Sequence, residues 1–147
     1  MNEKYSVILN GTIIQSSKRM ILGACNAFET VLVHGDISSE FLPLAAAALE
    51  DAAQVKVHAC KNSIGYFANA ELATHDDYHA EYLAQEIAVK VVTGFDQAIN
   101  HINEFTSDHT EVIISQDISR GQEFVRRINS SVVMVNASSR FSDGNQL

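Results

Sequence analysis

The feature that most constrains the fold is the alternation along the chain of short β-branched runs with longer segments whose apolar residues recur at helical spacing. Five runs have the length and composition of buried strands, over residues 30–33, 55–59, 88–92, 111–115 and 132–135. Helical spacing predicts helices over residues 3–15, 37–53, 95–105 and 121–128, and mixed patterning predicts loops and one short helix over residues 61–82. Because parallel strands need crossover connections, this order predicts an α/β fold with a mostly parallel sheet and helices on both faces.

Length and charge narrow the classes of function. A chain of 147 residues with 46% apolar residues has the size of one domain. Its formal net charge of -8, without any basic stripe, disfavours nucleic acid as a partner. No run reaches the roughly 20 apolar residues of a membrane span, and the start lacks the pattern of a signal peptide. We therefore expect no membrane partner, a cytoplasmic location, and free thiols at Cys25 and Cys60.

Several common catalytic motifs are absent from the sequence. The seven glycines are scattered, and no strand is followed by the glycine-rich turn that lets the backbone approach a phosphate at a helix amino terminus. The nucleophile elbow GxSxG and the zinc-binding helix HExxH are missing as well. The sequence therefore excludes a dinucleotide cradle of that kind and two common classes of hydrolase.

Cys25 has the clearest potential for covalent chemistry. It lies in residues 23–29, between a helical segment and a strand, where small neighbours leave room for a substrate carbonyl to reach the sulfur. A thiolate is a strong nucleophile whose pKa falls near positive charge, and Lys18 and Arg19 are close in sequence. From the residues alone, however, a small buried thiol without a chemical role is the more frequent case.

The histidines offer a second candidate chemistry. His75 and His79 stand four residues apart with two aspartates between them, and on a helix they could ligate a metal. A solvent-exposed charged segment is the more frequent meaning of such a cluster, so we expect no metal site. His58 and Cys60 share one face of a strand pattern, and we interpret both as core or sheet-face residues.

Two longer segments resemble a known family. Residues 23–33, Gly-Ala-Cys-Asn-Ala-Phe-Glu-Thr-Val-Leu-Val, are similar to the active-site cysteine segment of γ-glutamyl phosphate reductases, also called glutamate-5-semialdehyde dehydrogenases. Residues 135–144, Val-Asn-Ala-Ser-Ser-Arg-Phe-Ser-Asp-Gly, resemble that family's motif before its final substrate-side loop, and residues 109–113 fit a weaker segment between the two. Their order and spacing also fit, so the resemblance favours Cys25 as a nucleophile over Cys25 as a buried thiol.

The resemblance implies an enzyme of the aldehyde dehydrogenase superfamily that acts in proline biosynthesis. Members convert γ-glutamyl phosphate and NADPH into glutamate 5-semialdehyde, phosphate and NADP. Cys25 would attack the acyl phosphate and carry the acyl group as a thioester, which hydride from the cofactor then reduces. The backbone N–H of Cys25 would stabilise the oxyanion, and Asn26 is either a catalytic helper or an ordinary turn residue.

Three further residues gain candidate roles from the resemblance. Glu81 stands where the superfamily has a glutamate that binds the nicotinamide ribose, although a solvated surface glutamate is an equally good interpretation. Asn136 and Arg140 could hold the substrate carboxylate or phosphate, the arginine through its planar fork. An exposed loop charge is the competing interpretation of Arg140.

The chain departs from the family in two respects. Members usually carry Lys-x-Gln-Arg shortly before the cysteine, and Met20 and Ile21 replace the Gln-Arg pair if Lys18 is aligned without gaps. The alternative is to align Arg19 and accept two extra residues. A lost arginine would remove positive charge that could lower the thiol pKa or bind phosphate. The family's cofactor-binding domain should also precede this chain, and a glycine-rich substrate-side segment should follow it.

We therefore expect residues 1–147 to be a single catalytic domain of the aldehyde-dehydrogenase type. It should fold alone but be inactive without the separate domain that holds most of the NADPH. The substrate should be the small molecule γ-glutamyl phosphate, and the full-length enzyme should be a homo-oligomer. The alternative is a non-catalytic binding or oligomerisation module that keeps this fold and has lost the chemistry.

Overall fold

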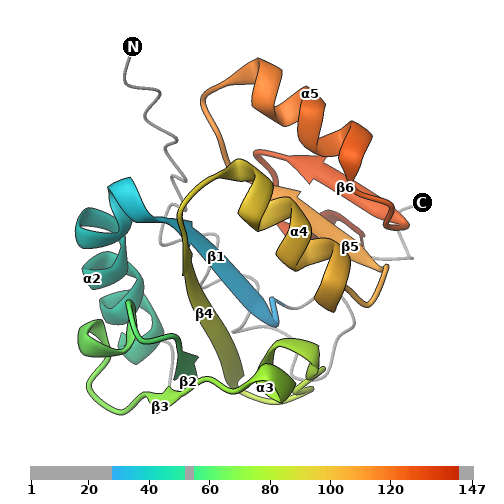
Figure 1. Cartoon of the computed structure of the whole chain (residues 1–147). Helices are drawn as coiled ribbons and strands as arrows, with labels where there is room; N and C mark the ends of the chain where they lie inside the picture. The colour runs from blue at the N-terminus through green and yellow to red at the C-terminus, as the bar shows by residue number, and fades with distance from the viewer. Residues whose placement is uncertain (1–27, 52–54, 143–147) are drawn as a thin grey trace.

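The computed structural model describes residues 28–51 and 55–142. Figure 1 shows the elements within these residues. They are β1 (Thr30–His34), α2 (Gly35–Asp51), β2 (Lys56–Ala59), β3 (Glu71–Leu72), α3 (His75–His79), β4 (Glu86–Val92), α4 (Phe95–Phe105), β5 (Thr110–Ile113), α5 (Ile118–Arg127) and β6 (Val132–Val135), with the 3₁₀ helices η1 (Ile64–Tyr66) and η2 (Ser139–Ser142). No helix in the described ranges is long and apolar enough to cross a membrane.

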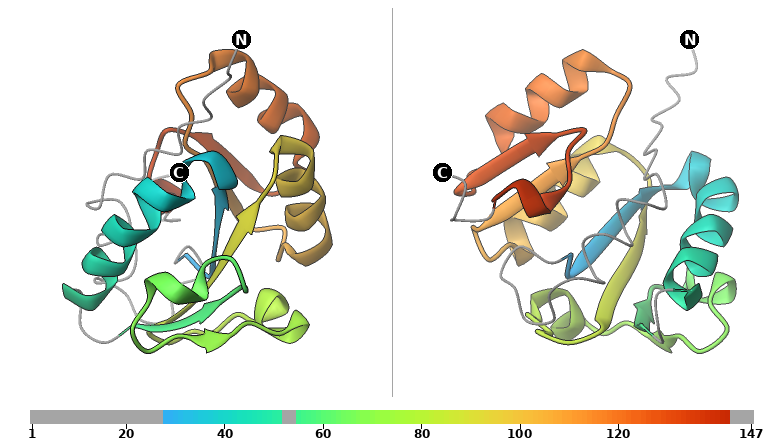
Figure 2. Two further views of the ribbon diagram at one scale, coloured as in Figure 1. Left: turned by 60° about the vertical axis from the view of Figure 1, so that its left-hand side comes forward. Right: turned by 180° about the vertical axis from the view of Figure 1, so that it is seen from behind.

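Within the described residues, every strand runs parallel to its neighbours, in two sheets. β1, β4, β2 and β3 form a four-stranded sheet in that order, and β5 and β6 form a separate pair. β1 is in register with β4 from Thr30 opposite Ala88 to His34 opposite Val92. The β5–β6 pair lies beyond β1, on the side away from β4 (Figures 1 and 2). The predicted α/β class with parallel strands is confirmed, although the strands divide between two sheets.

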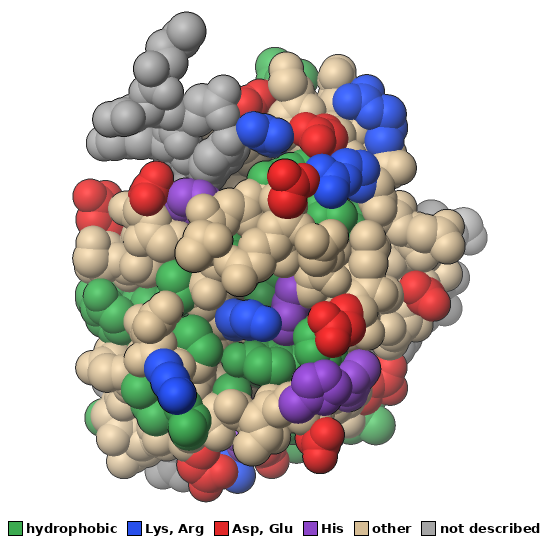
Figure 3. All heavy atoms as spheres, viewed as in Figure 1, with side chains coloured by type: hydrophobic (Ala, Val, Ile, Leu, Met, Phe, Trp, Pro, Cys, Tyr) green, Lys and Arg blue, Asp and Glu red, His purple; other side chains and the backbone are tan. Residues whose placement is uncertain are grey.

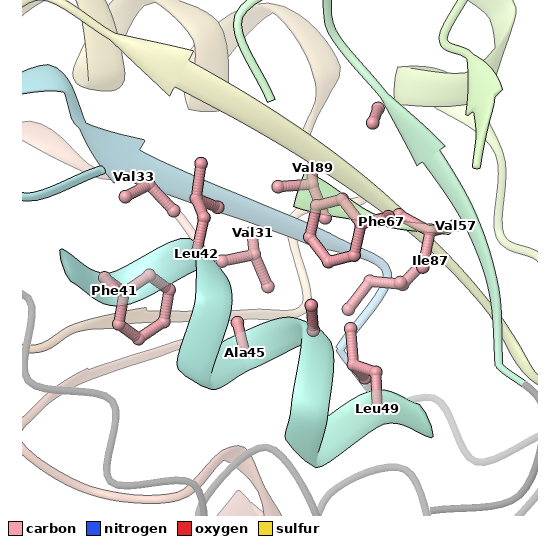
Figure 4. Close-up of a cluster of buried hydrophobic side chains, with 12 residues drawn as sticks. Val31, Val33, Phe41, Leu42, Ala45, Leu49, Val57, Phe67, Ile87 and Val89 are labelled. Atoms are coloured by element: carbon pink, nitrogen blue, oxygen red, sulfur yellow. The ribbon is translucent and has the colours of Figure 1, made fainter. Parts of the chain in front are cut away.

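Helix α2 covers one face of the four-stranded sheet. Alternate residues of β1 and β4, including the fully buried Val33 and Ile87, point toward this helix and form the larger core (Figure 4). Leu42 of α2 is also fully buried in this core. Its truncation to alanine would cost about 2–5 kcal/mol because the methyl groups lose their contacts and leave a cavity. This core fixes the strands whose amino-terminal ends carry the candidate site.

Helices α4 and α5 pack over the β5–β6 pair. Ile99 of α4 and Phe124 and Ile128 at α5 form a second buried cluster, against which Ile113 of β5 and Val133 of β6 pack. The two helices therefore hold the second sheet in place beside the first.

Most predicted boundaries lie within a few residues of the observed ones. α4 spans the predicted residues 95–105, whereas α5 begins at Ile118 rather than residue 121, because the Asp117 side chain accepts hydrogen bonds from two backbone N–H groups of its first turn. The short helix predicted within residues 61–82 is α3. β3 was not predicted, because both of its residues are exposed and carry no apolar alternation. The helix predicted over residues 3–15 lies outside the described residues.

Candidate active site

A cavity of about 400 Å³ lies on the side of the first sheet that faces away from α2. Its walls come from β1 and the two residues before it, from the segment between α3 and β4, from α4 and from β5. Most of the lining is aliphatic and aromatic, and the titratable side chains in it are Glu29, His34, Tyr78, His79, Glu81, His101, Glu111 and Arg120. A mostly apolar cavity with a few converging polar groups is the usual form of a small-molecule site.

The amino-terminal ends of β1 and β4 meet at this cavity. The backbone N–H of Ala88 donates to the carbonyl oxygen of Glu29 at 2.8 Å, so the residues before the two strands leave the sheet side by side. Phe28 and Glu29 line the cavity from the segment that precedes β1, here called the β1 arm. Glu81 and Leu83 line it from the segment that precedes β4, the β4 arm. Two chain segments far apart in sequence therefore reach one site.

Glu81 belongs to an irregular stretch between α3 and β4, which hydrogen bonds to Asp77 hold to α3. Asp77 of α3 accepts hydrogen bonds from the backbone N–H and hydroxyl of Thr74 at 2.7 and 2.6 Å, and the Tyr82 hydroxyl donates to the Asp77 carbonyl at 3.0 Å. Leu83 has a φ of 47°, in the left-handed region. The carboxylate of Glu81 is exposed at the cavity, so it is available to a ligand.

The opposite wall of the cavity carries a buried histidine. His101 of α4 is 5% exposed, and its Nδ1 lies 3.0 Å from Lys90 Nζ. Its Nε2 has no hydrogen-bond partner among residues 28–51 and 55–142. Burial and the Lys90 charge lower the pKa of His101 to about 4, so its ring is neutral near pH 7. Burial, together with the charges of Cys60 and Asp77, raises the pKa of Tyr78 to about 12.

Aromatic rings surround the Lys90 ammonium. Its Nζ lies 4.9 Å from the ring centroid of Tyr78 and 6.0 Å from that of Phe105, both within reach of a cation–π interaction. Histidine side chains gather over α3 and α4 next to acidic ones in Figure 3. The grouping of Lys90, Tyr78 and His101 was not predicted from the sequence. A lysine inside the apolar run 88–92 was a usable signal, because a charge in a buried strand needs a partner.

Glu111 is a further cavity residue that sequence reasoning missed. Burial raises its pKa, an effect partly opposed by the Thr106 hydroxyl, which donates to Glu111 Oε1 at 2.5 Å. The signal in the sequence was weak, because a single glutamate in a short apolar run gives no periodicity of its own.

The predicted nucleophile Cys25 and its neighbour Asn26 lie outside the described residues, as do Lys18 and Arg19. Their roles therefore stay predictions. Arg140 is in η2, which is held near the start of β5 by a hydrogen bond from the Thr110 hydroxyl to the Ser142 hydroxyl at 3.1 Å.

Asn136 makes a reciprocal pair of hydrogen bonds with the backbone of Ser115. Its Oδ1 accepts from the Ser115 N–H and its Nδ2 donates to the Ser115 carbonyl, each at 2.9 Å. Its φ of 55° is left-handed, a conformation that asparagine tolerates better than most residues. The amide therefore ties the end of β6 to the end of β5, and Asn136 does not line the cavity that contains Glu81.

The structure also describes the other histidines that the sequence singled out. No group of three or more His, Cys, Asp or Glu within the described residues is arranged to hold a metal ion, and His75 and His79 pack their rings 5.0 Å apart. His58 is buried on the sheet, as predicted, but it lies between two carboxylates.

Cys60 lies just past the end of β2 and is only partly buried. Burial alone would raise the pKa of its thiol, but hydrogen bonds from Ser63 and from backbone N–H groups, that of Val91 among them, lower it. The thiol is therefore more readily ionised than an ordinary cysteine.

Comparison with known proteins extends these observations. No protein family model matches the chain. Over all 147 residues it is 74% identical to a γ-glutamyl phosphate reductase of Colwellia psychrerythraea, and it covers 34% of that protein. The crystal structure of a γ-glutamyl phosphate reductase from Thermotoga maritima superposes with a TM-score of 0.89 at 36% identity, over 98% of this chain and 34% of that one.

The chain is a homologue of the γ-glutamyl phosphate reductases. The resemblance drawn from residues 23–33 and 135–144 is thereby confirmed. An acetylating aldehyde dehydrogenase from Geobacillus thermoglucosidasius shares the fold, with a TM-score of 0.67 at 14% identity over 98% of this chain and 40% of that chain. The predicted fold, that of an aldehyde-dehydrogenase catalytic domain, is confirmed as well. The chain spans about a third of the length of the reductases it matches.

Proposed function

We propose that the chain is the cysteine-bearing catalytic part of an NADPH-dependent reductase that converts γ-glutamyl phosphate to glutamate 5-semialdehyde in proline biosynthesis. The observation that carries the proposal is the convergence of two arms on one cavity, Phe28 and Glu29 before β1 and Glu81 before β4. Cys25 is three residues before Phe28, so the extended chain allows it at most about 11 Å from that residue. The nucleophile and the predicted ribose contact then serve the same site.

The proposed chemistry begins at the Cys25 sulfur. The thiolate attacks the acyl carbon of γ-glutamyl phosphate, a C–S bond forms, and the C–O bond to phosphate breaks with phosphate as a stabilised leaving anion. Reduction of the thioester then breaks the C–S bond, releasing glutamate 5-semialdehyde and regenerating the thiolate. The backbone N–H of Cys25 donates to the oxyanion in the first step, and Asn26 assists as a second local donor.

The cofactor contact proposed for this chain is Glu81. Its exposed carboxylate at the cavity fits a pair of ribose hydroxyls, because a carboxylate offers only acceptors and a ribose offers two donors. When bound, NADPH supplies a hydride. The rest of the cofactor would be held by the part of the reductase that this chain does not span.

Arg140 is a proposed substrate contact, together with Asn136, which lies outside the cavity that contains Glu81 and would meet only a part of the substrate that extends beyond that cavity. The Asn136 amide has two protons and uses one on Ser115, so one donor remains for a carboxylate or phosphate oxygen. The guanidinium of Arg140 would bind the same groups through two parallel hydrogen bonds. We further propose a cytoplasmic location, which suits the free and ionisable thiol of Cys60, and a homo-oligomeric full-length enzyme.

A chimera tests the proposal. The matching third of the Colwellia psychrerythraea reductase is replaced by this chain, a conservative exchange at 74% identity. Activity is measured in the reverse direction, as formation of NADPH from glutamate 5-semialdehyde, phosphate and NADP. We expect activity from the chimera and none from the isolated chain, because the isolated chain lacks most of the cofactor contacts.

Variants of the chimera separate the residues. C25S should lose at least about a thousandfold in kcat, because the nucleophile is removed. E81Q should raise the KM for NADP about tenfold, since a ribose contact is weakened. C60S is the matched control for C25S and should stay within about twofold of the parent. Full activity of C25S, or turnover by the isolated chain, would contradict the proposal.

A further inference from the structure

We propose that His58 is a positioning residue that holds the Glu81 segment, residues 77–86, against the four-stranded sheet. The inference rests on the proposed role of Glu81 for its functional meaning, and on contacts within the described residues for its geometry. His58 lies on β2, and its side chain is 8% exposed. It does not line the cavity.

One imidazole ring contacts both ends of the segment. Nδ1 of His58 lies 3.1 Å from Asp77 Oδ1, where the segment begins, and Nε2 lies 2.8 Å from Glu86 Oε2, where it ends. A ring nitrogen that carries a proton can donate to the carboxylate beside it, and a single ring can therefore link both ends of the segment to β2.

The same ring also holds the middle of the segment. The ring of Tyr82, the residue after Glu81, stacks on His58 with 5.1 Å between centroids and 7° between planes. The Tyr82 hydroxyl closes the arrangement by donating to Asp77 at its carbonyl and, at 3.2 Å, its Oδ1. The contacts of Tyr82 therefore restrict the backbone at the adjacent residue 81.

The segment needs such a tether because its own secondary structure is weak. α3 has only five residues, too few for a helix to persist without tertiary contacts. Residues 80–85 belong to no helix or strand. Burial alone would raise the pKa of Asp77, but hydrogen bonds from Thr74 and the charge of His58 hold it below its ordinary value. Asp77 therefore stays ionised and able to bind the ring at neutral pH.

Lys56 forms ion pairs with two carboxylates near His58, one of which, Glu86, His58 also contacts. Lys56, on the same strand as His58, lies 3.8 Å from Glu86 Oε2 and 3.1 Å from Glu71 Oε2 of β3. Lys56 is more exposed than His58, so its ion pairs are worth less. His58 is thus the buried centre of a group that consists of Asp77, Tyr82, Glu86, Lys56 and Glu71.

The first test measures backbone motion in the isolated chain. H58F keeps a ring to stack on Tyr82 but loses both contacts to the carboxylates, and H58Q keeps one hydrogen-bonding group if the first variant fails to fold. ¹⁵N relaxation should give order parameters near 0.85 for residues 80–85 in the wild type and below about 0.6 in H58F. Residues of α2 and α5 should be unchanged.

The matched control is H109F. His109 Nδ1 contacts the hydroxyl of its neighbour Thr110 at 2.6 Å, far along the chain from the Glu81 segment. This variant should leave the order parameters of residues 80–85 as in the wild type. Unchanged values in H58F would overturn the inference, and so would a uniform loss of order across α2 and α5, which would indicate a general structural role.

The second test uses the chimera. H58F should raise the KM for NADP by up to about tenfold and leave kcat within about twofold, because the reacting groups are untouched while the ribose contact is misplaced. In the background of E81Q, H58F should add little, since the contact it positions is already weakened. Fully additive effects would overturn the positioning role. A normal KM for E81Q alone would instead refute the proposed function of Glu81, and the relaxation measurement would still decide the tether.

Discussion

Replacing His101 with glutamine should make the free energy of unfolding less sensitive to acid. His101 is buried beside Lys90, and its pKa is lowered from 6.5 to about 4 in the folded chain. Below pH 6.5, His101 therefore binds a proton in the unfolded chain, whereas in the folded chain it stays neutral until the pH approaches 4. The stability that depends on the neutral ring is fully present above pH 6.5 and is lost progressively as the pH falls toward 4.

The size of the effect follows from the two pKa values. Between pH 8 and pH 5 the difference in proton uptake corresponds to about 2 kcal/mol of unfolding free energy. H101Q removes the titration and keeps an acceptor for the Lys90 ammonium. The variant should therefore lose about 2 kcal/mol less than the wild type over this range.

The assay is urea unfolding followed by far-ultraviolet circular dichroism, because the chain contains no tryptophan. Unfolding free energies are compared at pH 8 and pH 5. H75Q is the matched control, since the His75 side chain is 65% exposed, and it should lose as much stability as the wild type. An equal acid-induced loss of stability in H101Q and the wild type would show that His101 is not the group responsible.

Two further predictions concern packing and the end of β6. A Cβ at Gly121 would lie 2.9 Å from Val135 Cγ1. G121A should therefore lower the unfolding free energy by about 1–2 kcal/mol, despite alanine's better helix propensity. V135A removes the clashing methyl groups and should relieve that loss in the double variant. Additive losses on urea unfolding would show that the clash is not the cause. N136A should cost about 2 kcal/mol, because it loses both hydrogen bonds to Ser115 and leaves a residue with a side chain in a left-handed conformation, whereas N136G should cost about 1 kcal/mol less. Equal urea midpoints for N136A and N136G would contradict the conformational part of this argument.

The strands and longer helices could be predicted from the sequence because their signals are local. The runs at residues 30–33, 88–92 and 132–135 are apolar and β-branched, and each is a strand in the structure. The α4 boundaries were predicted well because its apolar residues recur at helical spacing. The start of α5 was displaced because the cap at Asp117 precedes the apolar pattern that marked the helix.

The division into two sheets could not be predicted, because strand pairing depends on contacts between residues far apart in the chain. The candidate site was predictable only in part for the same reason. The resemblance named Glu81, and the structure places it at a cavity with Phe28 and Glu29. The partners of His58 and His101 come from other elements, at sequence separations of 11 to 28 residues, and no periodicity reports such pairs.

The hydrogen-bonded ladder between β1 and β4 also sets where this chain can change length. Both arms of the site precede their strands, so a one-residue slip between the strands would shift one arm by about 3.3 Å against the other and turn its side chains to the opposite face. Insertions between residues 80 and 86 act on that spacing directly. Insertions in the turn at residues 93–94, at the other edge of the sheet, leave it untouched. Length variation among related chains should therefore concentrate at the carboxyl-terminal edge of this sheet.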